Sequence, residues 1–300
     1  MQRRIVRNKV LDFSRSTNTI SVVGVGMKEY LDLVRLVFDH GTLKKSRTGV
    51  DTISYFGAHY KVDLSKGFPL LTTKEVNWNS LLHELLWYLS GEDHIRNLRQ
   101  HTKIWDAWAD EAGNLDTAYG RYWRRFPSPY KNASGEWRVR EVDQIQFILD
   151  TLRKEPHSRR MVVTAWEPGN ATTSKLPPCH FSFVFNVQDN KLNCHLTQRS
   201  GDIALGIPFN LACYAALTQM LAQEVGLAPG WFSHTIVDAH IYTGVPEYDH
   251  APGLREQLNR EPRPLPRLVI AKKPLNELKF DDFTLEDYRP HPKIKFKVAI

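Results

Sequence analysis

Apolar residues recur at helical spacing in four segments of the chain. In MKEYLDLVRLVFDHG (27–41) they fall on one face and the run stops at a glycine, which predicts an amphipathic helix. NSLLHELLWYLSG (79–91) is apolar nearly all round and predicts a buried helix. VDQIQFILDTLRKEP (142–156) predicts a helix ended by its proline, and FNLACYAALTQMLAQEVG (209–226) predicts a long apolar helix.

Four other segments have the alternation or the composition of strands. DTISYFGAHYKVDL (51–64) alternates and predicts two strands around a turn at Gly57. MVVTAW (161–166), FSFVFNVQ (181–188) and KLNCHLTQR (191–199) are β-rich runs of strand length. The chain therefore contains enough strands for a sizeable sheet.

The order of these elements bears on the fold class. Because strands and helices mix without a regular βαβ rhythm, we expect an α+β fold. The polar stretch PSPYKNASGEWRVRE (127–141) is interpreted as a surface loop or hairpin insertion, not as a linker between domains. A length of 300 residues with 42% apolar content suits one large core, so we expect a single domain.

Basic residues outnumber acidic ones, with 40 Lys and Arg against 33 Asp and Glu and a formal charge of +7. This charge would suit nucleic acid, a membrane surface or a small anionic substrate. Residues 1–26 hold part of it and lack the apolar core of a signal peptide, so we interpret them as a basic extension before a single domain over 27–300. No apolar run is long enough for a transmembrane helix. Three cysteines are too few for a disulfide framework, and we expect a reducing cytoplasm.

Cys179, in LPPCHFSFVF, is the candidate nucleophile. The later motif QRSGDIALGIPFN supplies Arg199, a cation that would stabilise a thiolate. The polar residues that accompany the thiol are His180, Gln198, Arg199 and Ser200, a donor set suited to an anion. A buried structural thiol is the alternative, and it is our interpretation of Cys194 and Cys213.

Several charged residues are also candidates. Glu84 lies in the apolar helix around HELLW, where an ionised carboxylate is costly, so its pKa should rise unless it is paired. Such a carboxyl is a good general acid or base near neutral pH, and a surface glutamate is the alternative. Arg47, Arg159 and Arg160 lie at predicted element ends, where phosphates are commonly held, although each could be a solvated charge.

Other residues have two interpretations each. Asn210 could cap the long helix or pair with the edge of a base. Trp105 and Trp108, in IWDAWAD, could belong to the core or form a stacking wall for a planar ligand. His240 and Tyr242, two apart in DAHIY, point to the same face of a strand and could both reach a sugar hydroxyl.

Two partial motifs do not support the sites that they suggest. VVGVGMKE has Glu29 at the position of the third glycine of a dinucleotide-binding loop. HELLW has Trp87 where a zinc-binding helix needs its second histidine. We therefore expect neither a dinucleotide nor a metal.

Many short motifs, taken in order, resemble those of the thymidylate synthase family over nearly the whole chain after about residue 27. They are RTG, GFPLLTTK, HELLWYLSG, IWDAWADE, AYG, SRR, LPPCH, QRSGDIALGIPFN, DAHIY, REPRPLP and the terminal VAI. The resemblance implies a homodimeric α+β fold, in which a large twisted mixed β-sheet with helices on one face packs against the sheet of its dimer mate. It also implies methylation of dUMP at C5 by 5,10-methylenetetrahydrofolate, which supplies both the carbon and the hydride, without a metal.

The resemblance also implies roles for individual residues. Cys179 would attack C6 of the uracil, Glu84 would organise proton transfers, and Tyr119 would help to remove the C5 proton. The catalytic set implied is Cys179, Glu84, Tyr119, His180 and Arg199. The substrate-binding set is Arg47, Gln198, Ser200, Asp202, Asn210, His240 and Tyr242, joined by Arg159 and Arg160 reaching in from the other subunit. The folate side is Ile104, Trp105, Trp108, Leu176, Asp202, Gly206 and Phe209, closed by the tail residues Val298, Ala299 and Ile300.

Some positions depart from the family pattern, and we expect them to cluster around the base pocket, the ribose side and the closing tail. They are Asn77, Tyr122, Val184, Val237, Thr243, Gly244 and Lys297. They leave open a pyrimidine nucleotide 5-hydroxymethylase, which uses the same cysteine and folate but ends in hydration without hydride transfer. Asn210 favours uracil over cytosine, because cytosine-specific relatives have aspartate there. Nucleic-acid binding without catalysis is a remote alternative.

Overall fold

The computed structural model describes residues 27–46 and 49–299, so the basic extension, Arg47 and Ile300 lie outside the described residues. The helices are α1 (Lys28–His40), α2 (Trp78–Ser90), α3 (Tyr119–Arg124), α4 (Gln144–Lys154), α5 (Asn170–Thr173), α6 (Gly206–Glu224) and α7 (Ala251–Leu258). Short 3-10 helices are η1 (Leu64–Lys66), η2 (Leu98–Gln100), η3 (Pro246–Tyr248), η4 (Leu275–Glu277) and η5 (Phe280–Asp282). The strands are β1 (Thr42–Lys44), β2 (Asp51–Asp63), β3 (Phe126–Lys131), β4 (Trp137–Val142), β5 (Val162–Thr164), β6 (His180–Gln188), β7 (Lys191–Gln198), β8 (Gly201–Asp202), β9 (Ala228–Thr243), β10 (Arg267–Ile270) and β11 (Phe283–Glu286).

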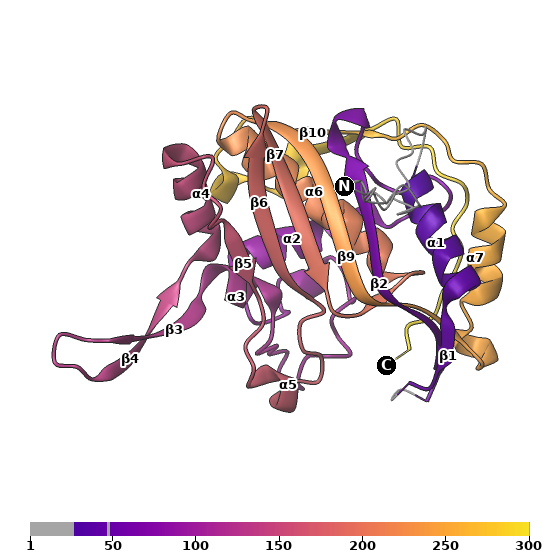
Figure 1. Cartoon of the computed structure of the whole chain (residues 1–300), viewed down its shortest axis with the longest axis horizontal. Helices are drawn as coiled ribbons and strands as arrows, with labels where there is room; N and C mark the ends of the chain where they lie inside the picture. Colours follow the sequence, from indigo (N-terminus) through magenta and orange to yellow (C-terminus); the bar gives the residue numbers. More distant parts are fainter. Residues whose placement is uncertain (1–26, 47–48, 300) are drawn as a thin grey trace, which may run out of the picture.

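A mixed sheet of seven strands forms the centre of the molecule (Figure 1). Its order is β1–β2–β9–β7–β6–β5, and β8 also pairs with β9. The strand β9 is antiparallel to β2 but parallel to β7 and β8. The expected α+β fold with a large mixed sheet is therefore confirmed.

Residues 51–63 form one continuous strand, so the prediction of two strands around a turn at Gly57 is wrong. Gly57 does adopt a positive φ of 77°, a conformation that glycine reaches at little cost. However, β2 pairs with β9 on both sides of it, from Asp51 opposite Thr243 to Asp63 opposite Trp231. Because the long partner strand supplies hydrogen bonds on both sides, the glycine changes the local backbone without ending the strand.

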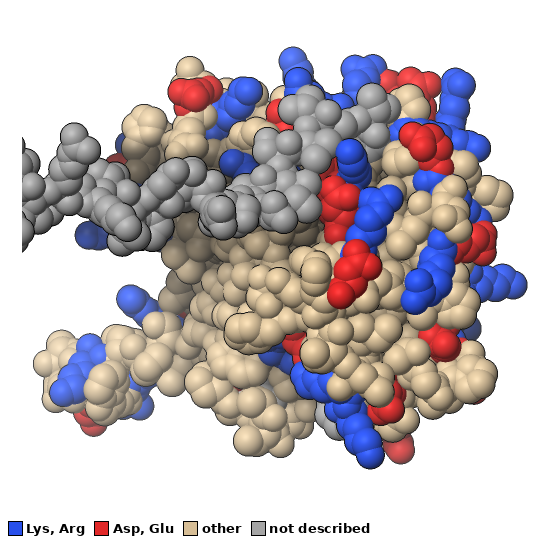
Figure 2. Space-filling view, turned by 45° about the vertical axis from the view of Figure 1, so that its right-hand side comes forward, with Lys and Arg blue, Asp and Glu red and all other residues tan. Residues whose placement is uncertain are grey.

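The helices α2 and α6 lie behind the sheet in Figure 1, and its front carries no helix in that view. The burial pattern of β9 follows this arrangement: Phe232, His234 and Ile236 are buried, whereas Trp231, directly before them, is 39% exposed. Figure 2 shows a broad surface of uncharged residues in the middle of the view, with Lys, Arg, Asp and Glu gathered to its right. The middle of this surface thus has few charged side chains, which would suit packing against another layer.

Local sequence explains where the two central helices begin. Asn77 caps α2 by accepting a hydrogen bond from the backbone N–H of Ser80 (3.1 Å). The long helix α6 starts at Gly206, four residues before Asn210. Asn210 is therefore not an N-cap, and its side chain is available to the cavity described below.

The polar stretch after α3 forms the β3–β4 hairpin, which projects from the left of the molecule in Figure 1. This confirms the hairpin alternative for residues 127–141. No helix within the described part of the chain is long and apolar enough to cross a membrane.

Candidate active site

The candidate catalytic residues meet at one cavity of about 800 Å³. Its wall combines the residues before β6, the ends of β7 and β9, the start of α6, part of α2 and the C-terminal tail. The predicted site residues that line it are Glu84, Ile104, Trp105, Trp108, Tyr119, Leu176, Cys179, His180, Gln198, Arg199, Ser200, Asp202, Gly206, Phe209, Asn210, His240, Tyr242, Val298 and Ala299. Residues from widely separated motifs thus form a single site.

Cys179 lies in a loop whose backbone is fixed by neighbouring side chains. The Tyr119 hydroxyl accepts a hydrogen bond from the Cys179 N–H (2.7 Å). Arg199 donates from Nη2 to the Pro177 carbonyl (2.6 Å) and from Nε to the Pro178 carbonyl (3.0 Å). The two carbonyls hold the guanidinium against the loop, and a guanidinium has further N–H groups for an anion.

His180 and Tyr119 form a stacked pair beside the thiol. Their ring centroids lie 3.7 Å apart with an interplanar angle of 5°. His180 Nδ1 lies 2.7 Å from the hydroxyl of Tyr214 in α6. Because burial lowers the pKa of His180 to about 3, its ring is neutral at physiological pH.

Glu84 is a buried carboxyl, with only 8% of its surface exposed. Burial raises its pKa to about 7, although hydrogen bonds from Trp105 and Tyr88 oppose the rise. Trp105 Nε1 donates to Glu84 Oε1 at 2.7 Å. The group can therefore gain or lose a proton near neutral pH, as expected from its apolar helix.

Gln198 has a buried supporting network. Its Nε2 donates to the Ser200 carbonyl (2.9 Å) and its Oε1 lies 3.0 Å from His234 Nε2. His234 Nδ1 is in turn 2.8 Å from the hydroxyl of Tyr60. This chain of contacts fixes the end of β7 and the turn that carries Arg199 and Ser200.

Asp202 faces a buried histidine that the sequence did not single out. Burial would raise the pKa of Asp202, but His250, His240 and the backbone N–H of Ala204 together lower it. His250 Nδ1 lies 3.4 Å from Asp202 Oδ1, and its Nε2 donates to the carbonyl of Lys297 (2.9 Å). Burial lowers the pKa of His250, but Asp202 outweighs it and raises the pKa. His250 thus connects Asp202 to the C-terminal tail.

The tail lies over the cavity in this structure. Val298 and Ala299 line the cavity, and the Phe296 ring packs 5.1 Å from that of His250. The Lys297 ammonium pairs with Glu247 and lies 4.9 Å from the ring centroid of Tyr248, both in η3. Lys297 thus fastens the tail to the segment that follows β9.

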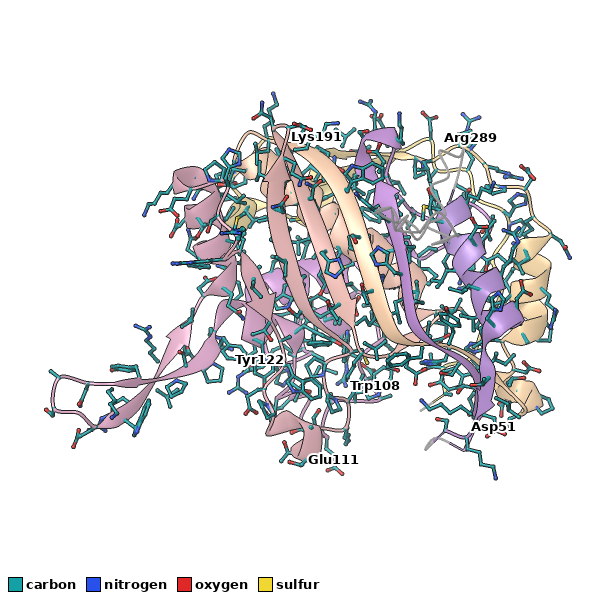
Figure 3. All side chains as sticks on the ribbon, viewed as in Figure 1. Asp51, Trp108, Glu111, Tyr122, Lys191 and Arg289 are labelled. Atoms are coloured by element: carbon teal, nitrogen blue, oxygen red, sulfur yellow. The ribbon has the colours of Figure 1, made fainter. Side chains whose placement is uncertain are left out.

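Aromatic and apolar side chains form one side of the cavity. The Trp105 and Trp108 rings lie 5.6 Å apart, and Trp105 also packs against Tyr119. Figure 3 places Trp108 at the lower end of the sheet. Trp105 therefore belongs both to the core, with 8% of its surface exposed, and to the wall of the cavity.

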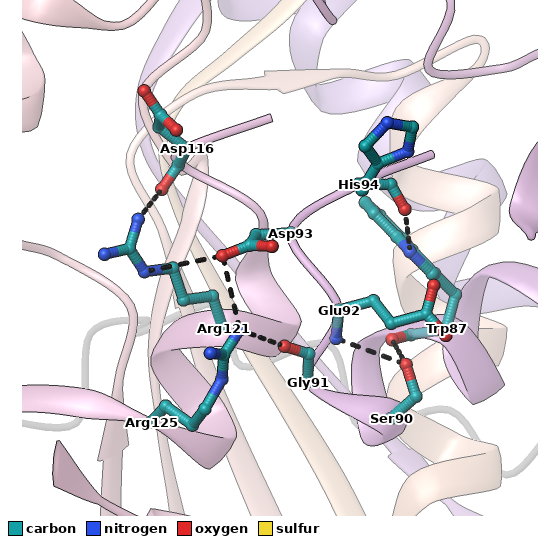
Figure 4. A network of polar contacts seen from close by, with 9 residues as sticks. All are labelled: Trp87, Ser90, Gly91, Glu92, Asp93, His94, Asp116, Arg121 and Arg125. Atoms are coloured by element: carbon teal, nitrogen blue, oxygen red, sulfur yellow. Dashed lines mark hydrogen bonds and ion pairs between the residues drawn. The ribbon is translucent and has the colours of Figure 1, made fainter. Parts of the chain in front are cut away.

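A polar network supports α3, whose first residue is Tyr119 (Figure 4). Arg125 Nη2 donates to the Gly91 carbonyl (3.0 Å) and to Asp93 Oδ2 (3.2 Å). Arg121 donates to the Asp116 carbonyl (3.2 Å). This network borders a second cavity of about 420 Å³, which contains none of the predicted site residues.

Three candidate arginines are not placed at the cavity. Arg159 and Arg160 are exposed between α4 and β5 and do not line it, and Arg47 lies outside the described residues. Residues that the sequence did not single out but that line the cavity include Lys44, Tyr88, Lys175 and Asp238. Within residues 27–46 and 49–299, no cluster of three or more His, Cys, Asp or Glu side chains could hold a metal ion.

The departing positions lie outside the lining of the cavity. Val184 pairs with Val162 in the sheet, and Asn77 caps α2. None of Asn77, Tyr122, Val184, Val237, Thr243, Gly244 and Lys297 lines the cavity. Lys297 nevertheless belongs to the tail beside the cavity, and Thr243 directly follows Tyr242, so an effect of these positions on base and ribose binding stays a prediction.

Comparison with known proteins agrees with this geometry. A sequence model of the family described as thymidylate synthase matches residues 28–300. The chain is also 50% identical to a thymidylate synthase of Haloferax volcanii, over 92% of this chain and 98% of that relative. The match extends across every element that forms the cavity. The chain therefore belongs to the thymidylate synthase family.

Proposed function

We propose that the protein transfers a one-carbon unit from 5,10-methylenetetrahydrofolate to C5 of dUMP and releases dTMP and dihydrofolate. One observation carries the proposal: Cys179, Glu84 and Arg199, far apart in sequence, line the same cavity. Membership in the thymidylate synthase family supports the same reaction.

Cys179 is the nucleophile of the proposed reaction. Its thiolate adds to C6 of the uracil, the S–C6 bond forms, and the electron pair displaced from the double bond makes C5 nucleophilic. Arg199, oriented by the carbonyls of Pro177 and Pro178, stabilises the thiolate and contributes to phosphate binding with Ser200. The thiolate leaves again when the product forms.

Proton transfers are assigned to the buried side chains next to the thiol. Glu84, with its pKa raised to about 7 by burial, takes and returns protons at the base. Tyr119 helps to remove the C5 proton, and neutral His180 supports the network through its stacking contact. Asn210 pairs with the uracil edge, which its donor and acceptor can match.

The lining of the cavity fits a reduced folate. The cosubstrate supplies both the transferred carbon and the hydride. The apolar and aromatic side that would hold it comprises Ile104, Trp105, Trp108, Leu176, Gly206 and Phe209. Asp202 is ionised because its pKa is lowered, and it accepts hydrogen bonds from N–H groups of the pterin. The tail keeps water from the reacting centre.

The remaining assignments depend on a second subunit and on the sugar. Arg159 and Arg160, exposed at the edge of the sheet, are proposed to bind the phosphate in the site of a dimer mate, together with Arg47 of that site. The uncovered front of the sheet is the proposed dimer surface. His240 and Tyr242 bind the ribose, with Gln198 fixing the turn beside the phosphate. A single catalytic domain over 27–300 and a cytoplasmic location remain predictions.

A 5-hydroxymethylase is the competing outcome, and the structure does not favour it. The departing residues that suggested it do not themselves line the cavity. In addition, the 50% identity to a thymidylate synthase supports formation of dTMP. Hydride transfer is therefore the better-supported ending.

The test is a product balance. Purified protein is incubated with dUMP tritiated at C5 and with methylenetetrahydrofolate, and released tritium and dihydrofolate are both measured. Equal amounts are expected. Release of tritium without dihydrofolate would support hydroxymethylation instead. Cys179→Ser should abolish tritium release, whereas the control Cys194→Ala, at a buried thiol outside the cavity, should retain it.

A further inference from the structure

Asp238 lies in the cavity wall at the junction of three strands. Lys44 of β1 donates from Nζ to Asp238 Oδ2 (2.5 Å), and Ser54 of β2 donates from Oγ to Oδ1 (2.8 Å). The hydrogen bond with His240 lowers the pKa of Asp238, and the bonds from Lys44 and Ser54 lower it further, so the carboxyl is ionised. A charged carboxylate is thus held in one orientation beside His240 of β9.

His240 presents one edge of its ring to Asp238. Its Nδ1 lies 3.2 Å from the Asp238 carbonyl oxygen and 3.5 Å from the carboxylate Oδ1. Both atoms are acceptors only, so Nδ1 must carry the hydrogen. The opposite edge, with Nε2, makes no hydrogen bond to any residue that the structure describes, and His240 borders the cavity.

We propose that Asp238 is a positioning residue that holds His240 as the Nδ1–H tautomer and so leaves the Nε2 lone pair as an acceptor for a sugar hydroxyl. The inference rests on the proposed nucleotide substrate. The inference adds that the sugar hydroxyl donates its hydrogen to His240 Nε2. Lys44 and Ser54 contribute by holding the Asp238 carboxylate in place. Of these two, Ser54 does not line the cavity; its hydroxyl contacts Asp238, and its backbone lies opposite that of His240 in the sheet.

A substrate analogue separates this role from a merely structural one. The ratio of KM for 2′,3′-dideoxy-UMP to KM for dUMP measures how much the 3′-hydroxyl contributes, and we expect a ratio of about ten in the unaltered protein. Asp238→Ala should lower this ratio at least threefold, and Asp238→Asn, which keeps an acceptor oxygen, should lower it less. Ser54→Ala should lower it about twofold.

Ser233→Ala is the matched control, because Ser233 lies on the same strand but contacts His195 instead (3.0 Å). It should leave the ratio unchanged. If Asp238→Ala and Ser54→Ala raise both KM values equally and keep the ratio, the positioning role is wrong. If the unaltered protein does not turn over dUMP at all, the proposed function fails, and the next measurement still tests the tautomer.

Nitrogen NMR of the protein labelled with ¹⁵N-histidine tests the tautomer without any reaction. Comparison with His240→Gln identifies the two signals. We expect a protonated Nδ1 and an unprotonated Nε2 at pH 8, and a shift of Nε2 when dUMP binds. The opposite tautomer, or protons on both nitrogens, would overturn the proposal.

Discussion

Replacing the buried Glu84 by Gln should stabilise the protein while it damages catalysis. The substitution keeps the shape of the side chain and keeps an oxygen that can accept the Trp105 Nε1–H bond now present at 2.7 Å. It removes only the ability to ionise. Opposite effects on stability and activity are typical of a residue whose buried charge is retained for function.

The magnitude follows from the pKa of Glu84, which burial raises from 4.5 to about 7. Between these two values the unfolded chain loses the proton while the folded protein keeps it. The unfolded state then binds fewer protons, so stability falls as pH rises through this window. Above the folded pKa the loss is complete at about 3 kcal/mol, an upper estimate.

Denaturant unfolding at fixed protein concentration, from pH 5 to pH 8, measures this term. The free energy of unfolding of Glu84→Gln should exceed that of the unaltered protein by up to about 3 kcal/mol at pH 8, and the difference should shrink toward pH 5. Glu111→Gln is the control, because Glu111 is exposed (Figure 3). A constant difference across this pH range, or a less stable variant at pH 8, would refute the reasoning. Tritium release from dUMP should fall at least a hundredfold in Glu84→Gln.

Three further substitutions test other contacts. Trp105→Phe removes a donor to Glu84, so the pKa seen in the pH profile of kcat should rise; an unchanged profile would contradict the role of that bond. Lys297→Met removes the exposed ion pair between the tail and η3, so KM for the folate should rise a few-fold while kcat stays nearly unchanged. Added salt screens the same ion pair, so it should raise this KM in the unaltered protein but not in the variant. Arg160→Ala and Cys179→Ser should each be nearly inactive. When the two variants are mixed, half of the dimers contain one subunit of each kind and therefore one intact site of two, so about a quarter of full activity should return. No recovery would show that Arg160 does not act across the dimer.

The apolar pattern of the sequence predicted α1, α2, α4, α6 and the fold class, but it did not predict the shorter helices α3, α5 and α7. Residues 79–91 are apolar nearly all round and 209–226 form a long apolar run, and most side chains of α2 and α6 are indeed buried. Periodicity failed at Gly57, because whether a glycine ends a strand depends on its partner. Here β9 continues past it, and that pairing joins segments far apart in the chain.

The site was predictable where a motif carries its own chemistry, as with the cysteine in LPPCH and the arginine in QRS. Asp238 and His250 carried no such signal. Asp238 matters because Lys44 and Ser54 converge on it from two other strands, and His250 because folding buries it between Asp202 and the tail. Such contacts are created by the tertiary structure, so a single sequence does not reveal them.

The most direct test of the account is whether Cys179 forms a covalent bond with the nucleotide. The protein is mixed with dUMP and methylenetetrahydrofolate, quenched during turnover, digested and analysed by mass spectrometry. We expect a nucleotide adduct on the peptide that contains Cys179 and none on the peptides that contain Cys194 or Cys213. Turnover without any adduct, or an adduct that persists in Cys179→Ser, would contradict the account.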